Sequence, residues 1–163
     1  MGVTGINEAI SPDIQMKMKL MGTITFFEGF TSNDLLYTAQ IADWLKMGPG
    51  DVIFAEGDLG SAFWIVLKGT VRVVKRMPDI PDQVLAFIPT GECFGEMSII
   101  SGQPRTAHCI ASEEVFLFRI DGQKLSRTTD ALQLKFYKRF AVVLAARLAR
   151  TSQNLMNRPP AAV

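Results

Sequence analysis

The sequence predicts an α+β fold, in which helices come first, an antiparallel β-roll fills the middle and one long helix ends the chain. Three observations predict it. Residues 26–45 carry apolar side chains at helical spacing. Residues 51–120 break into short β-branched and aromatic runs separated by glycine or proline, which is typical of a sandwich or barrel. Residues 130–156 return to helical spacing. We therefore expect a jelly-roll-like β-barrel flanked by helices.

The first elements are predicted from their capping residues. Ser11 followed by Pro12 indicates a helix start, because serine caps the first turn and proline fits the first helical position. Residues 26–45 are expected to form one or two helices. Within them, Thr31 begins a capping run before Leu35. The helical pattern ends at residues 48–50, Gly-Pro-Gly.

Short strands are predicted from residue 51 to residue 120. A loop is expected at 77–83, because Pro78 and Pro81 interrupt the pattern there. Between the strands, a short helical turn is expected after Gly95. The predicted strands are 52–54, 62–67, 71–74, 84–88, 108–110 and 115–118.

The last element is a predicted helix over about 130–156, which the sequence Arg-Pro-Pro at 158–160 ends. A stripe of four apolar residues recurs along it at helical intervals. We interpret this stripe as core or as a dimer seam: Phe136, Phe140, Leu144 and Leu148.

Composition limits the class of protein. A chain of 163 residues fits one domain, which we place at 23–163 after a helical extension at 1–22. The net charge of +1 speaks against a general nucleic-acid surface. Cys93 and Cys109 are too few for a disulfide framework, which favours a reduced, cytoplasmic setting. Neither a membrane-spanning run nor a signal-peptide layout is found in the sequence.

The run 94–107, Phe-Gly-Glu-Met-Ser-Ile-Ile-Ser-Gly-Gln-Pro-Arg-Thr-Ala, carries the most chemical information. Gly95 lets the backbone approach an anion at the start of a helical turn. Arg105 adds a permanently charged, planar fork for a phosphate. Glu96 repels a phosphate, so we expect it to accept a hydrogen bond from a neighbouring hydroxyl. The run is thus suited to a sugar phosphate.

This run resembles the phosphate-binding cassette of the cyclic-nucleotide-binding domain family. That family includes the bacterial catabolite activators, the regulatory subunits of cyclic-AMP-dependent protein kinase and the cyclic-nucleotide-gated channels. The resemblance extends over about 24–152, with matching turn signals at Gly57-Asp58 and Gly69-Thr70-Val71.

The resemblance implies a role for each cassette residue. Glu96 would accept a hydrogen bond from the ribose 2′-hydroxyl, and Arg105 would pair with an exocyclic phosphate oxygen. Backbone N–H groups from Gly95 to Met97 and Ser98 would hold the other phosphate oxygens. No metal or cofactor is implied, and the ligand would be cyclic AMP or cyclic GMP.

Three residues bear on which base the ligand carries. Thr106 permits a contact to guanine without requiring it, whereas Thr151 and Ser152 match a segment of the catabolite activators that contacts adenine. We lean slightly towards cyclic AMP. An apolar pocket wall is implied as well, although core packing accounts equally well for its members: Val73, Leu85 and Ile88.

The function expected is that of a regulatory sensor without catalytic activity, which signals through movement of its C-terminal helix. We expect an unidentified protein effector and a homodimer through the 140–148 face. DNA binding is not expected, because only residues 157–163 follow the helix. One alternative is a cupin-like enzyme, disfavoured by the single histidine, His108. Another is a ligand-free structural module in which Glu96 and Arg105 form an ion pair.

Overall fold

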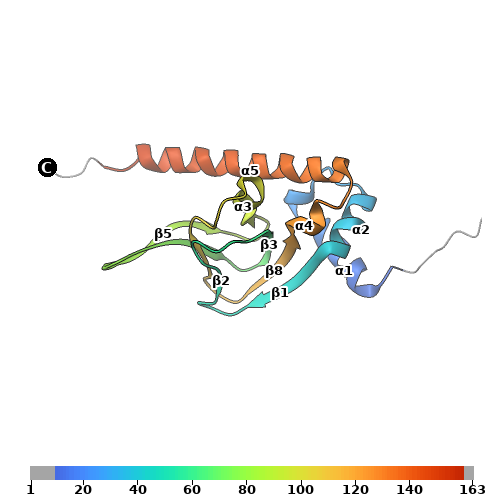
Figure 1. Cartoon of the computed structure of the whole chain (residues 1–163), viewed down its shortest axis with the longest axis horizontal. Coiled ribbons are helices and arrows are strands. Elements are labelled where there is room, and N and C mark those ends of the chain that lie inside the picture. The colour runs from blue at the N-terminus through green and yellow to red at the C-terminus, as the bar shows by residue number, and fades with distance from the viewer. Residues whose placement is uncertain (1–9, 160–163) are drawn as a thin grey trace, which may run out of the picture.

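Two four-stranded antiparallel sheets form a roll, with helices at one end and along one side (Figure 1). This computed structural model describes residues 10–159. The helices are α1 (Pro12–Met21), the 3-10 helix η1 (Thr25–Phe27), α2 (Ser32–Ile41), α3 (Glu96–Ser101), α4 (Gly122–Leu125) and α5 (Asp130–Met156). The strands are β1 (Ala42–Met47), β2 (Val52–Phe54), β3 (Ala62–Lys68), β4 (Val71–Met77), β5 (Ile80–Ile88), β6 (Cys93–Phe94), β7 (His108–Ala111) and β8 (Val115–Asp121). The predicted fold class is confirmed. Part of the predicted extension at 1–22, residues 1–9, lies outside the described residues.

The strand order gives the roll two hydrophobic cores. One sheet has the order β1-β8-β3-β6 and the other the order β2-β7-β4-β5. Between the sheets lies a core that includes Trp64, Val66 and Leu117. A second core joins the first sheet to the helices and is rich in phenylalanine: Phe26, Phe27, Phe63, Phe136 and Phe140.

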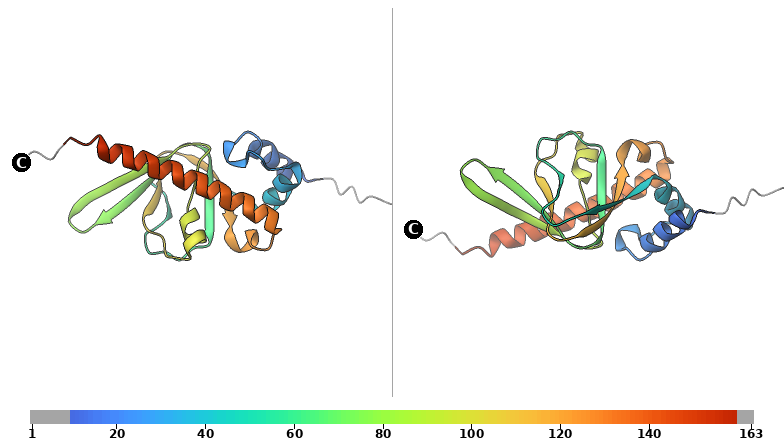
Figure 2. Two further views of the ribbon diagram at one scale, coloured as in Figure 1. Left: turned by 90° about the horizontal axis from the view of Figure 1, so that it is seen from above. Right: turned by 90° about the horizontal axis from the view of Figure 1, so that it is seen from below.

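Helix α5 lies across the roll and extends past it. The Thr129 hydroxyl caps the helix by accepting a hydrogen bond from the Leu132 N–H at 3.3 Å, and the predicted range 130–156 is confirmed. Its C-terminal half projects on the same side as the β4–β5 hairpin (Figure 2). No helix within residues 10–159 is long and apolar enough to cross a membrane.

Residues 42–45 correct the prediction of a helix up to residue 45. They belong to strand β1, which pairs with β8 so that Ala42 lies opposite Ile120 and Met47 lies opposite Val115. Strand pairing with a segment far along the chain overrides local helical spacing here.

The predicted loop at 77–83 is also wrong. Met77 lies opposite Ile80, so Pro78 and Asp79 form a two-residue turn in which Asp79 has φ +63°. Pro81 lies within β5, and β5 tolerates it because this strand is at the edge of its sheet.

Candidate functional site

A cavity of about 170 Å³ lies between the second sheet, the short helix α3 and helix α5. All six cassette residues that the resemblance assigned to ligand binding line it: Gly95, Glu96, Met97, Ser98, Arg105 and Thr106. The remaining lining residues are Phe54, Val73, Ala86, Ile88, Phe94, Ala107, Cys109 and Arg147. A polar side thus faces an apolar wall.

Gly95 shapes the polar side of the cavity. It precedes α3 with φ +82°, in the left-handed region. A Cβ atom at this position would lie 2.9 Å from the Trp64 ring and 3.1 Å from Arg105 Nη1. A side chain at residue 95 would therefore strain the backbone and displace the arginine.

Glu96 is the first residue of α3 and is only 1% exposed. Its Oε1 atom accepts a hydrogen bond from Arg147 Nη1 of α5 at 2.8 Å. Burial raises the pKa of the Glu96 carboxyl, and the nearby Arg147 guanidinium opposes this rise. Arg147 also donates to the Cys93 carbonyl and lies 3.7 Å from Oε2 of Glu92. Helix α5 is thus bonded to the cassette through one arginine.

Arg105 is 4% exposed and is held by backbone carbonyls. Its Nη1 and Nη2 atoms donate to the carbonyls of Gly95 and Ala62, each at 2.6 Å. The guanidinium carbon lies 4.3 Å from the centroid of the Phe54 ring. Its Nε has no hydrogen-bond partner within residues 10–159. The alternative of a Glu96–Arg105 ion pair is wrong for this structure, because Glu96 pairs with Arg147 instead.

Of the three residues assigned to the pocket wall, two line the cavity and one does not. Val73 and Ile88 line the cavity. Leu85 is 59% exposed and does not. Val71 pairs with Ile88 and Val73 with Ala86, so strand alternation brings Ala86 and Ile88 to the wall, whereas Leu85, which a bulge leaves unpaired, is on the other face.

Thr151 and Ser152 lie outside the lining of the cavity and are exposed. The Thr151 hydroxyl donates to the carbonyl of Arg147 at 2.9 Å, within α5. The α5 residue that lines the cavity is Arg147, to which the sequence analysis gave no role. The position of Arg147 could have been found from the sequence. It lies one helical turn after Val143, at the end of the stripe of Phe136, Phe140 and Val143 that packs against the core.

Both cysteines are buried, and neither forms a disulfide within residues 10–159. Burial raises the pKa of the Cys109 thiol to about 12 and also raises the pKa of the Cys93 thiol. The two thiols are therefore unreactive at neutral pH.

A match to a family model identifies the fold of this chain. The model of the cyclic nucleotide-binding domain matches residues 44–131, more than half of the chain. This chain belongs to the cyclic nucleotide-binding domain family. The cassette resemblance and the regulatory class inferred from it are thereby confirmed.

Relatives of this cyclic nucleotide-binding domain differ in their nucleotide. The chain is 34% identical over 106 residues to the CRP-like cAMP-activated global transcriptional regulator of Mycobacterium tuberculosis, covering 65% of this chain and 47% of that protein. It is 37% identical over 87 residues to human cGMP-dependent protein kinase 2, covering 52% of this chain and 11% of the kinase. The chain therefore spans about half of the bacterial regulator and a small part of the kinase.

A crystal structure supports the fold. The cyclic nucleotide-binding domain from Methylobacillus flagellatus superposes with a TM-score of 0.77 at 24% identity, over 92% of this chain and 86% of that one.

Proposed function

We propose that this domain senses cyclic AMP or cyclic GMP, has no catalytic activity of its own and signals by movement of α5. The observation that carries the proposal is the contact from Arg147 of α5 to Glu96, the carboxylate assigned to the ribose. One side chain thus joins the ligand cavity to the helix that would transmit the signal.

The charges of the cavity suit a cyclic nucleotide. Arg105 is a buried cation that makes no ion pair within residues 10–159, and a phosphate would supply the missing anion. Glu96, at the start of α3, would accept the ribose hydroxyl. The base would then face the wall formed by residues such as Val73 and Ile88.

Competition for Glu96 would couple the ligand to α5. Oε1 of Glu96 accepts a hydrogen bond from Arg147 at 2.8 Å, and we propose that a ribose hydroxyl bonded to the same carboxylate redirects the guanidinium. A ligand shifts a helix only when it binds the two helix positions with different affinity. The Arg147–Glu96 contact would provide that difference.

We favour cyclic AMP over cyclic GMP, because Thr151 and Ser152 match a segment of the catabolite activators that contacts adenine. The name of the Mycobacterium tuberculosis relative refers to cyclic AMP and that of the human kinase to cyclic GMP. Thr106 lines the cavity and would meet either base. Thr151 and Ser152 would reach the base only after α5 moves. The cytoplasmic location and the absence of DNA binding stay predictions for a chain that spans half of a transcriptional regulator.

Replacing Arg147 with alanine tests the coupling. Because the ligand-free state alone loses the contact to Glu96, we expect the variant to bind cyclic AMP roughly threefold to tenfold more tightly in calorimetry. Hydrogen exchange should show that cyclic AMP changes α5 in the natural chain but much less in the variant.

Arg150→Ala is the matched control, because Arg150 contacts Glu92 and does not line the ligand cavity. It should bind like the natural chain. Absence of binding heat with both nucleotides would refute the sensor. An undiminished α5 response in Arg147→Ala would refute the coupling.

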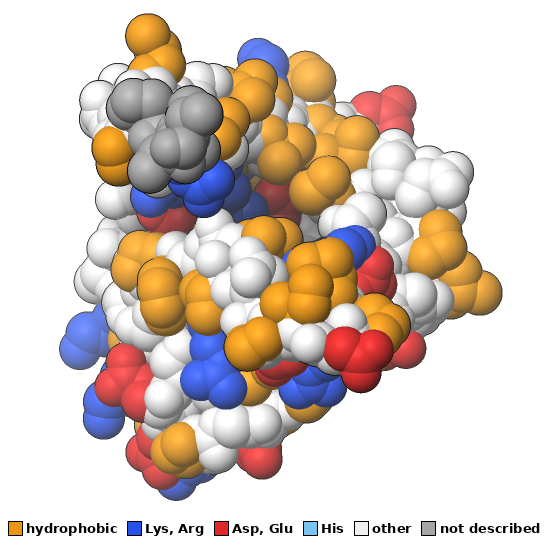
Figure 3. All heavy atoms as spheres, turned by 90° about the vertical axis from the view of Figure 1, so that its left-hand side faces the viewer, with side chains coloured by type: hydrophobic (Ala, Val, Ile, Leu, Met, Phe, Trp, Pro, Cys, Tyr) orange, Lys and Arg blue, Asp and Glu red, His pale blue; other side chains and the backbone are white. Residues whose placement is uncertain are grey.

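We further propose a homodimer through α5. Its C-terminal half and the β4–β5 hairpin project together, and exposed hydrophobic side chains gather at that end of the molecule (Figure 3). Leu148, Leu155 and Met156 are exposed on α5, as are Leu85 and Phe87 on β5. Such a surface is typical of an interface.

Light scattering should therefore give twice the chain mass of 18.0 kDa. Leu148→Asp places a charge at the 69% exposed Leu148, and we expect it to yield a monomer with an unchanged circular dichroism spectrum. Phe140 is buried in the core and so cannot belong to this interface, which narrows the expected 140–148 face to its exposed end at Leu148; Leu134→Asp, exposed near the start of α5, should therefore stay dimeric. A monomeric mass for the natural chain, with and without nucleotide, would refute the dimer.

A further inference from the structure

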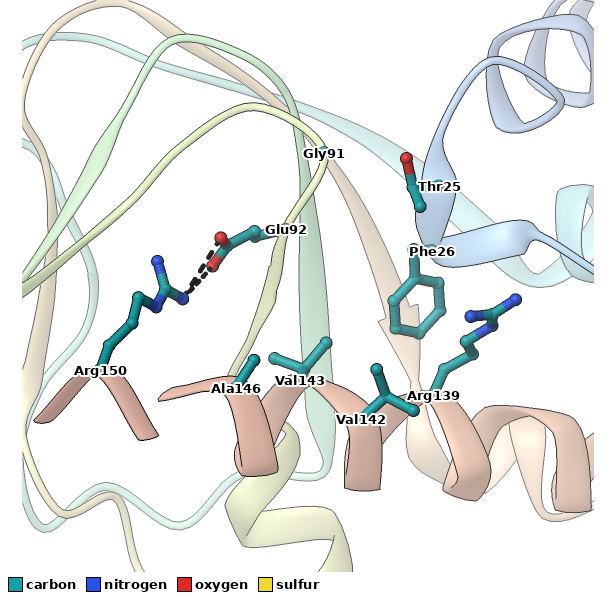
Figure 4. Close-up of a pocket in the computed structure, with 9 residues that line it drawn as sticks. All are labelled: Thr25, Phe26, Gly91, Glu92, Arg139, Val142, Val143, Ala146 and Arg150. Atoms are coloured by element: carbon teal, nitrogen blue, oxygen red, sulfur yellow. Dashed lines mark hydrogen bonds and ion pairs between the residues drawn. The ribbon is translucent and has the colours of Figure 1, made fainter. Parts of the chain in front are cut away.

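A second cavity, of about 180 Å³, lies between α5, η1 and the turn before β6 (Figure 4). Thr25 and Phe26 line it from η1, and Gly91 and Glu92 from the turn. The α5 residues that line it are Arg139, Val142, Val143, Ala146 and Arg150. It shares no lining residue with the nucleotide cavity.

The floor of this cavity is apolar. Phe26 points from η1 towards Val142, and Val143 and Ala146 continue the floor along α5 (Figure 4). Val142 remains exposed although it faces this hollow. Covering apolar surface of this kind with a ligand lowers the free energy of the complex.

The cavity also carries one cation without a carboxylate partner. Three charged residues line it: Glu92, Arg139 and Arg150. Glu92 and Arg150 neutralise each other, with the Arg150 Nη2 atom 3.4 Å from Oε2 of Glu92. Arg139 donates only to the backbone carbonyl of Glu28 and makes no ion pair within residues 10–159. Arg139, which also lines the neighbouring hollow, is therefore free to pair with an anion at this end of the cavity.

Size and charge together define a class of ligand. A cavity of roughly 150 Å³ holds a benzene ring, and this cavity measures about 180 Å³. We propose that it binds a small carboxylate with an apolar body, such as an aryl-substituted short-chain acid. The ring lies on Phe26, Val142 and Ala146, and the carboxylate pairs with Arg139.

Such a ligand would oppose the nucleotide, an effect that rests on the proposed function. The acid bridges α5 to η1 and stabilises the helix in the position where Arg147 holds Glu96. Because coupling between two sites is reciprocal, acid and nucleotide must weaken each other by the same factor.

The probe is 3-phenylpropionate, added to the full chain without nucleotide and followed by NMR of isotopically labelled α5 methyl groups. We expect saturable shifts at Val142 and Val143. Its neutral and cationic analogues, 3-phenylpropanol and 3-phenylpropylamine, should bind at least about tenfold more weakly, since they lack the charge-assisted hydrogen bond to Arg139. Equal binding of the alcohol would overturn the proposal.

Two variants locate the ligand. Ala146→Phe fills the floor from an exposed helix position and should abolish binding, and Arg139→Gln should weaken it about tenfold. Lys138→Gln is the control, because Lys138 lines only the neighbouring hollow. Binding that survives Ala146→Phe would place the acid elsewhere and refute the site.

A final titration measures cyclic AMP affinity with and without saturating 3-phenylpropionate. A decrease in affinity supports the regulatory role, and an unchanged affinity refutes it. Failure of the sensor itself is recognised separately, since cyclic AMP alone would then give no binding heat while the acid still shifts α5.

Discussion

Arg105→Ala should weaken cyclic nucleotide binding more than any other single change in the cavity. A hydrogen bond to a charged group contributes about 1.5–3 kcal/mol, so we expect at least a tenfold to hundredfold loss of affinity, at roughly 1.4 kcal/mol per tenfold. The loss grows if the phosphate remains buried without a cation. Calorimetric titration with cyclic AMP measures it.

Stability must be separated from affinity in this experiment. Arg105 also donates to the carbonyls of Gly95 and Ala62, and its loss leaves both without this donor. That costs about 1–3 kcal/mol for a buried acceptor. Val66→Ala, in the core between the sheets and outside the cavity, is the control for lost stability alone. Arg105→Lys keeps the charge without the fork and should bind with intermediate affinity. Unchanged binding in Arg105→Ala would remove Arg105 from the ligand site.

Local signals predicted the elements that are defined by local contacts. Helix α5 begins at Asp130, where the sequence expects it, because helical spacing and the cap that the structure shows at Thr129 both act within a few residues. The cassette was predictable for the same reason. Gly95 to Thr106 is one short stretch, and its six assigned residues line one cavity.

Long-range pairing accounts for what the sequence did not reveal. Strand β1 exists because Ala42–Met47 pairs with Val115–Ile120, 68 to 78 residues later. Leu85 and Ile88 are three residues apart on β5, so strand alternation places them on opposite faces, and of the two only Ile88 lines the cavity. Arg147 was missed because a cation within an apolar stripe looks solvated until its buried partner, Glu96, is known.

Phe140→Ala is expected to cause the largest loss of stability. Phe140 is fully buried on α5, with its ring centroid 4.9 Å from that of Phe63 and 6.1 Å from that of Phe26. Replacing a buried phenylalanine with alanine costs about 3–5 kcal/mol, because the surrounding core fills the cavity only in part. For a chain of this size the melting temperature should fall by roughly 6–20 °C. Thermal and urea unfolding followed by circular dichroism measure both quantities.

Leu134→Ala is the control on the same helix, since Leu134 is exposed, is not part of the proposed dimer surface and should change stability within about 0.5 kcal/mol. The comparison also shows whether α5 belongs to the cooperative unit of the domain. Phe140 joins α5 to η1 and to the first sheet, so its loss should shift one single transition. If the main transition instead stays in place while α5 alone becomes exchangeable, the helix detaches before the roll unfolds. In that case the Arg147–Glu96 contact would hold a locally unstable helix, and ligand binding at Glu96 would release it at a lower cost in free energy than the aromatic core implies.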